Sequence, residues 1–122
     1  DSGVSTESMK KFFDTPVWNS ILNRKMWQLY LPEKADGQNA QYVSPASASD
    51  LSNMPPTYIQ TAEFDCLRDE GVAFADALES AGNSVALDET KGTVHGFDMA
   101  SHSTITATAV NNRISFLNQI FE

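Results

Sequence analysis

Apolar residues recur at helical spacing near the start of the chain. The tripeptide at residues 14–16 (Asp-Thr-Pro) offers a cap followed by a proline, and Pro32 ends the pattern. We therefore predict one amphipathic helix over residues 17–30, preceded by a polar entry and followed by a loop that continues to residue 49. The apolar positions of this helix are Val17, Trp18, Ile21, Leu22, Met26, Leu29 and Tyr30.

Two short β-forming segments follow, with a helical pattern between them. Residues 57–62 carry β-branched and aromatic side chains after a Pro-Pro pair, which predicts a buried strand, and residues 85–89 predict a second one. The segment 67–81 places its apolar residues on one helical face, has acidic residues in its first turn and is followed by Gly82 as a C-terminal cap.

A final helix completes the predicted order of helix, strand, helix, strand, helix. Its apolar positions are Val110, Ile114, Leu117 and Phe121, and its candidate caps are Ser101 and Ser103. Strands separated by helices pair in parallel through right-handed crossovers, so the fold class is α/β. Because a parallel sheet is normally covered on both faces and has more strands, two strands predict one end of a larger, incomplete sheet.

Composition narrows the function classes without selecting one. The 122 residues are 41% hydrophobic, which suits a single domain with a core, and the formal charge of −8 disfavours an electrostatic nucleic-acid binder. No apolar run is long enough for a membrane span or a signal peptide. The single cysteine, Cys66, excludes an internal disulfide and a multi-cysteine zinc cage, and it favours a reducing, cytoplasmic compartment.

Candidate chemistry gathers where the two predicted strands end. Asp65 follows the first strand and His95 follows the second. In open α/β sheets functional groups collect at the carboxyl ends of parallel strands, so these two side chains are predicted to lie within hydrogen-bond reach. Such a pair fixes the imidazole tautomer and holds the ring as a general base. The alternative from spacing alone is that Asp65 caps a helix and His95 is a structural residue.

Specific residue motifs in the sequence resemble those of a known family. Residues 50–71 read DLSNMPPTYIQTAEFDCLRDEG, and they resemble the segment of the hormone-sensitive-lipase-like esterases in which a Pro-Pro-containing strand leads to the catalytic aspartate in an Asp-x-Leu-x-Asp-Glu run. Residues 92–97, GTVHGF, are similar to the Gly-x-x-His-Gly-Phe loop that supplies the family's histidine. Residues 27–31 and 44–45 also resemble the family, and residues 50–97 carry the specificity of the match.

The resemblance implies a fold and two roles. It implies that Asp65 and His95 are the acid and base of an α/β-hydrolase triad, whose chain order is Ser, Asp, His. It further implies that residues 1–49 form a cap-like helical segment with its connection, and that residues 50–122 form the C-terminal β-α-β-α part of an α/β-hydrolase fold. No cofactor and no metal is implied.

Two departures from the family pattern change the expectation for this chain. Cys66 stands where the family usually has proline, which should alter loop stiffness more than chemistry. The nucleophile elbow Gly-x-Ser-x-Gly is absent, since residues 3–7 fail at the last position, and no His-Gly-Gly oxyanion motif is present. We therefore expect the carboxyl-terminal half of an esterase, beginning after the nucleophile and without significant esterase activity by itself.

Three functional hypotheses from different classes remain open. The chain is part of a serine carboxylesterase or lipase acting on small-molecule esters, or it is a catalytically inactive binding or regulatory module of hydrolase ancestry, or it is a truncated fragment without a role of its own. A severed sheet has an open edge and uncovered helix faces, which predicts self-association or association with the missing N-terminal half. A nucleic-acid partner and a membrane span are not expected.

Other candidate sites are weaker. The residues His95, Asp98 and His102 do not match a standard zinc spacing. Cys66 is expected to be a quiet structural residue, because the neighbouring carboxylate of Asp65 disfavours its thiolate. An aromatic-rich set near the start of the chain either packs in the core or shapes a cap over an acyl pocket. This set is Met9, Phe12, Phe13, Trp18, Met26 and Trp27.

Overall fold

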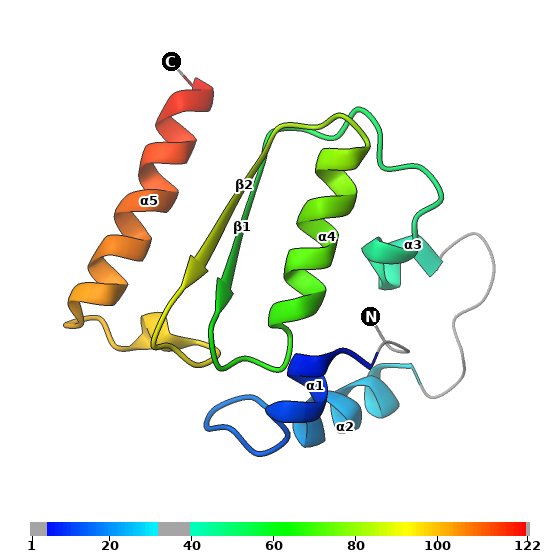
Figure 1. Cartoon of the computed structure of the whole chain (residues 1–122), viewed down its shortest axis with the longest axis vertical. Coiled ribbons are helices and arrows are strands. Elements are labelled where there is room, and N and C mark those ends of the chain that lie inside the picture. The colour runs from blue at the N-terminus through cyan, green and yellow to red at the C-terminus, as the bar shows by residue number, and fades with distance from the viewer. Residues whose placement is uncertain (1–4, 32–39, 122) are drawn as a thin grey trace.

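Two parallel strands lie between two long helices, and the helices nearest the N-terminus lie below the carboxyl ends of the strands (Figure 1). This computed structural model describes residues 5–31 and 40–121. The helices are α1 (Glu7–Lys11), α2 (Ser20–Tyr30), α3 (Ala40–Val43), α4 (Arg68–Ser80) and α5 (Thr104–Phe121), and the strands are β1 (Thr57–Ala62) and β2 (Val85–Thr90). Two 3₁₀ turns, η2 (Pro45–Ser47) and η3 (Phe97–Met99), complete the order.

The strands pair in parallel, as the sequence predicts. The register runs from Thr57 opposite Val85 to Ala62 opposite Thr90, so both strands end at the same edge of the sheet. Within the described residues the sheet has only these two strands, and each therefore has one edge without a strand partner. The sheet is incomplete, and its class is the α/β architecture expected from the alternation of strands and helices.

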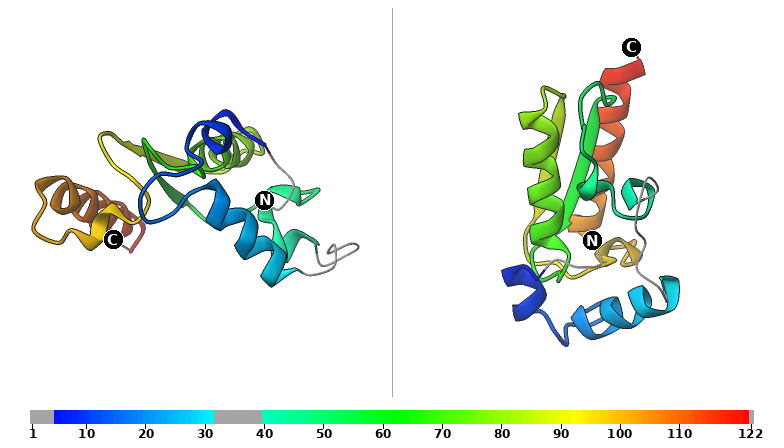
Figure 2. Two further views of the ribbon diagram at one scale, coloured as in Figure 1. Left: turned by 90° about the horizontal axis from the view of Figure 1, so that it is seen from below. Right: turned by 90° about the vertical axis from the view of Figure 1, so that its right-hand side faces the viewer.

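Side chains of β1 alternate between the two helices, because successive residues of a strand point to opposite faces. Thr61 faces α4, where a Cβ on Gly71 would lie 2.8 Å from its methyl group. Tyr58 and Gln60 face α5: the ring of Tyr58 packs on Phe116, and Gln60 accepts hydrogen bonds from the Arg113 guanidinium. Figure 2 shows α4 and α5 on opposite sides of the strands.

The contact between the sheet and α5 is largely polar. Asp88 of β2 accepts hydrogen bonds from Tyr58, Gln60 and, across to α5, Asn112. Burial, together with the Asp88 carboxylate, raises the pKa of Tyr58 to about 12. The outer face of α5 is meanwhile apolar and exposed, at positions Val110, Ile114, Leu117 and Phe121. This helix therefore carries an apolar stripe that no described residue covers.

The start of the chain differs from the prediction. Helix α2 begins at Ser20 instead of residue 17, because Val17 has a φ of +69°, which no right-handed helix accommodates, and because the Asn19 side chain caps the first turn by accepting from the Leu22 N–H. The polar entry contains helix α1, and the predicted loop to residue 49 contains α3 and η2. Residues 32–39, including Pro32, lie outside the described part of the chain.

The other boundaries agree closely with the prediction. Strand β1 has the predicted ends, β2 is one residue longer, and α4 is followed by Gly82 with φ +87°, a conformation that favours glycine at a helix C-terminus. Ser103, one of the two candidate caps, precedes α5 and accepts from the Ile105 N–H. No helix among the described residues is long and apolar enough to cross a membrane.

Candidate active site

Asp65 lies in a tight turn directly after β1. Its N–H donates to the carbonyl of Ala62, the last residue of the strand, and its carboxylate Oδ1 accepts from the Leu67 N–H at 2.9 Å, just before α4 begins. The side chain is 10% exposed. This hydrogen bond from the amide two residues on closes a local Asx-type turn ahead of α4, and it leaves Oδ2 available for a second partner.

His95 lies in the loop after β2, which two glycines and two hydrogen bonds hold in place. Gly92 and Gly96 have φ values of +70° and +69°. The Gly92 N–H donates to the Glu63 carboxylate, and the Phe64 N–H donates to the Thr93 carbonyl. These bonds tie the loop after β2 to the loop after β1. The imidazole is consequently presented to the Asp65 carboxylate.

The two side chains meet. His95 Nδ1 lies 2.8 Å from Asp65 Oδ2, which confirms the predicted proximity. An ionised carboxylate only accepts hydrogen bonds, so beside an ionised Asp65 the donor is Nδ1, and in the neutral form of that ring the lone pair is on Nε2. The bonds to the Leu67 N–H and to His95 use different oxygens of Asp65, so the carboxylate makes both at once. The arrangement is that of an oriented general base.

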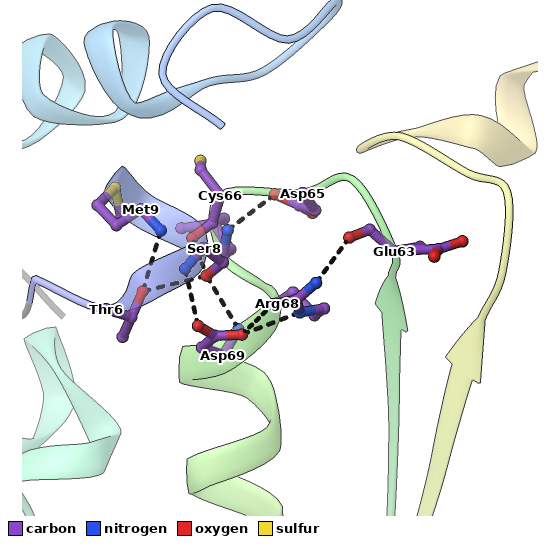
Figure 3. Close-up of polar contacts among 9 residues, drawn as sticks. Thr6, Ser8, Met9, Glu63, Asp65, Cys66, Arg68 and Asp69 are labelled. Atoms are coloured by element: carbon purple, nitrogen blue, oxygen red, sulfur yellow. Dashed lines mark hydrogen bonds and ion pairs between the residues drawn. The ribbon is translucent and has the colours of Figure 1, made fainter. Parts of the chain in front are cut away.

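A buried hydrogen-bond cluster holds the Asp65 turn from below (Figure 3). Ser8 of α1 is fully buried, and its hydroxyl donates to the carbonyl of Cys66, the residue after Asp65. The Ser8 N–H donates to the Asp69 carboxylate at 2.7 Å, and Arg68 makes two hydrogen bonds to the other carboxylate oxygen of Asp69. Sequence reasoning missed Ser8. The Thr6 cap, whose hydroxyl accepts from the Met9 N–H, is the local signal that would have revealed its helix.

This cluster predicts an acid-sensitive contribution to stability. Burial raises the pKa of Asp69, but hydrogen bonds from Ser8 and the Arg68 guanidinium outweigh it and hold that pKa below its ordinary value. A carboxyl whose pKa is lowered by folding stabilises the fold fully above its unfolded-chain value, about 3.9, and loses that contribution as the pH falls through the folded value.

We expect Asp69→Asn to lower the free energy of unfolding at neutral pH, and the gap from the unmutated chain to shrink as the pH falls below about 4. Urea unfolding at a series of pH values measures this gap. The matched control is Asp76→Asn, at an exposed aspartate of the same helix. A gap that is constant from pH 7 to about pH 2 would contradict the assignment.

A cavity of about 620 Å³ opens beside the pair. Asp65 and His95 line it, together with Met26 and Trp27 of α2, Ser44 and residues of α4. The aromatic-rich set from the start of the chain is thus divided: Phe12 is buried and packs edge-on against Phe64, whereas Met26 and Trp27 form part of the cavity wall. The role of α2 as a cap over an acyl group stays a prediction.

The candidate metal ligands and the Cys66 thiol are in surroundings that do not favour a chemical role. Asp98 forms an ion pair with Arg113, and in the described part of the chain no group of three His, Cys, Asp or Glu side chains is arranged to hold a metal ion. Cys66 is fully buried, and burial, together with the Asp65 carboxylate, raises the pKa of its thiol to about 11. A thiol with so high a pKa is a poor nucleophile at neutral pH.

Comparison with known proteins adds the family. Residues 2–99 match a family described by the alpha/beta hydrolase fold. The chain belongs to this alpha/beta hydrolase family. Neutral cholesterol ester hydrolase 1 of Pongo abelii is 34% identical over 103 residues, which cover 84% of this chain and 24% of that protein. Carboxylesterase NlhH of Mycobacterium tuberculosis is 47% identical over 55 residues, covering 45% of this chain and 17% of that enzyme.

The solved structures agree with this placement. A bacterial heroin esterase superimposes with a TM-score of 0.91 at 34% identity, and the match covers all of this chain and 40% of that one. The similarity of this alpha/beta hydrolase chain to named esterases confirms the resemblance recognised in residues 50–97. The chain spans about a quarter or less of the curated relatives that it matches.

Proposed function

We propose that this chain is the aspartate- and histidine-bearing part of a serine carboxylic-ester hydrolase. The observation that carries the proposal is the 2.8 Å contact between His95 Nδ1 and Asp65 Oδ2, made by loops that leave the same edge of a parallel sheet. Esterases among the alpha/beta hydrolases use such a pair with a serine that precedes it in the chain. The named relatives, which are ester hydrolases, support the substrate class.

The reaction follows from the geometry of the pair. Nε2 of His95 takes the proton of a serine hydroxyl while the serine oxygen attacks the ester carbonyl, and the same proton then passes to the departing alcohol. His95 next takes a proton from water, whose oxygen attacks the acyl-enzyme, and returns that proton to the serine as the carboxylic acid leaves. Asp65 holds the Nδ1 proton throughout and balances the positive charge on the imidazolium.

The nucleophile and the oxyanion donors come from outside these 122 residues in our proposal, because the sequence has neither a Gly-x-Ser-x-Gly elbow nor a His-Gly-Gly motif. The open edge of β1 and the apolar outer face of α5 are then surfaces for the rest of the protein or for a second copy of the chain. The cavity beside His95 is proposed to take part of a small-molecule ester.

We expect the 122-residue chain alone to show no significant, saturable hydrolysis of a short-chain 4-nitrophenyl ester. A positioned base contributes only about 10²–10⁴-fold by itself, far below an enzyme's usual acceleration. Initial rates from matched preparations, with free imidazole as the reference catalyst, measure this. Turnover that depends on His95 and saturates with ester would mean that a nucleophile lies within the chain.

The alternative of an inactive binding module predicts a different result. A longer protein that contains the chain but has no serine that reacts with an organophosphonate probe would favour the inactive module. That result would contradict the catalytic role proposed for Asp65 and His95. Hydrolysis by the longer protein that survives the loss of His95 would have the same consequence.

A further inference from the structure

The loop between α1 and α2 packs against the imidazole of His95. The indole ring of Trp18 lies with its centroid 5.9 Å from that of the imidazole, and the two ring planes are inclined by 35°. Trp18 comes from a part of the chain 77 positions before His95, so this contact is tertiary. Trp18 therefore lies beside the ring whose Nδ1 is paired with Asp65.

The loop adopts an unfavourable backbone conformation to make this contact. Val17 has a φ of +69°, a region that β-branched residues rarely enter. Local hydrogen bonds maintain the conformation: the Trp18 N–H donates to Pro16, the Thr15 hydroxyl donates to the Trp18 carbonyl, and the Asn19 amide donates to the Thr15 carbonyl. Strain of this kind persists only where the surroundings enforce it, and it concentrates at functional sites.

Consecutive residues of the two loops face each other. A Cβ built on Gly96 would lie 3.6 Å from a methyl carbon of Val17, which places Val17 beside Gly96 just as Trp18 lies beside His95. Gly96 itself has φ +69°, so both loops turn through the left-handed region at their point of contact. The two loops are therefore matched in shape over two successive residues.

His95 needs such a neighbour because one hydrogen bond does not fix a ring. The bond from Nδ1 to Asp65 holds one atom, and the imidazole, whose side chain is 40% exposed, still has freedom to tilt about that bond. The tilted indole ring of Trp18 beside the imidazole restricts that freedom. When the imidazole carries a second proton, its positive charge also lies within the range of attraction to the indole π face.

We propose that Trp18 is a positioning residue that fixes the plane of the His95 imidazole and so directs Nε2. The catalytic meaning of this inference rests on the proposed esterase function, whereas the positional claim stands on the contact itself. Trp18 touches His95, and it is not assigned a chemical step. The loop over residues 15–19 is strained in order to deliver this one side chain.

The test compares variants that differ in ring shape. Trp18→Leu keeps apolar bulk but removes the flat ring, whereas Trp18→Phe keeps a ring. The indole N–H has no hydrogen-bond partner among the described residues, so neither change breaks a hydrogen bond of the side chain. Phe116→Leu is the control, because it makes the same kind of change at an aromatic residue of α5 that packs on Tyr58 and does not line the cavity beside His95.

The first readout is the exchange of the His95 Nδ1 proton with water, followed by NMR in the 122-residue chain. We expect Trp18→Leu to speed exchange roughly tenfold, the upper range of what an aromatic pair contributes, with Trp18→Phe and Phe116→Leu close to the unmutated rate. Backbone amide exchange in α4 reports whether each variant is folded. Unchanged Nδ1 exchange in a folded Trp18→Leu variant would overturn the proposal.

A second readout needs no variant. In the unmutated chain, we expect proton–proton Overhauser effects between the indole and imidazole rings, and their absence would also overturn the proposal. In a longer protein that hydrolyses esters, Trp18→Leu should lower kcat and leave KM nearly unchanged; a change in KM alone would assign Trp18 to the substrate wall instead. The NMR readouts do not depend on hydrolysis, so failure of the esterase proposal is distinguishable from failure of this one.

Discussion

In a longer protein that joins this chain to a nucleophilic serine, Asp65→Asn is expected to lower kcat by about 10⁴-fold without unfolding the protein. Asparagine has the shape of aspartate, and its carbonyl oxygen is still able to accept the hydrogen bond that the Leu67 N–H donates to Oδ1. The amide group then faces His95 Nδ1 as a donor, which favours the tautomer with its proton on Nε2. In that tautomer the lone pair is on Nδ1, so Nε2 is unable to take the serine proton.

Steady-state kinetics with a 4-nitrophenyl ester measures this effect. Asp98→Asn is the control, because Asp98 lies in the same region after His95 but pairs with Arg113 at the surface, and it should change kcat by less than about twofold. His95→Ala should cost at least as much as Asp65→Asn, and the double variant should be no worse than His95→Ala, since members of a catalytic unit are not additive. A loss below about tenfold for Asp65→Asn would remove Asp65 from the mechanism.

Leu78→Ala is expected to lower the free energy of unfolding by about 2–5 kcal/mol. Leu78 is 1% exposed and is the largest fully buried side chain among the described residues, where it lies on α4. The buried apolar residues described are few and mostly small, namely Phe12, Ala62, Cys66, Ala75, Leu78 and Ala109. A cavity at Leu78 therefore removes much of a small core, in a domain whose total stability is of the order of 5–15 kcal/mol.

Urea unfolding followed by far-ultraviolet circular dichroism measures the loss. Leu117→Ala is the matched control, since it makes the same chemical change on a helix at a residue that is 51% exposed, and it should change stability by less than about 0.5 kcal/mol in the 122-residue chain. Equal effects of the two substitutions would mean that the face of α5 at Leu117 is covered in solution and that the core lies elsewhere.

The sequence predicts the part of the fold in which local pattern and tertiary packing agree. Strand β1 and helix α4 have strong periodic patterns bounded by turn residues, and Gly82 adopts the positive φ expected of a helix C-terminus. Because the order of these elements requires parallel pairing, the proximity of Asp65 and His95 followed from their places after the two strands. The site was predictable to this extent from motif and topology together.

The start of the chain was not predictable in the same way, because distant contacts determine it. Helix α1 has only five residues, too few to be stable alone, and its Ser8 bonds to groups about sixty positions further along the chain. Asn19 caps the helix, instead of the cap predicted just before Pro16, because Val17 has a positive φ that a helix starting at residue 17 does not accommodate. The sequence pattern does not distinguish Trp18 from the other apolar positions of the predicted helix, because its contact with His95 is made only in the folded chain.

The measurement that tests the central claim most directly is active-site labelling of the longest natural protein that contains this chain. A fluorophosphonate probe, which reacts with activated serines, is applied to the unmutated protein and to its His95→Ala variant, and the labelled peptide is identified by mass spectrometry. We predict one labelled serine outside residues 1–122, within a Gly-x-Ser-x-Gly sequence, and loss of its labelling in the His95→Ala variant. A labelled serine within residues 1–122, or labelling that does not depend on His95, would contradict the assignment of Asp65 and His95 as the pair that activates the nucleophile.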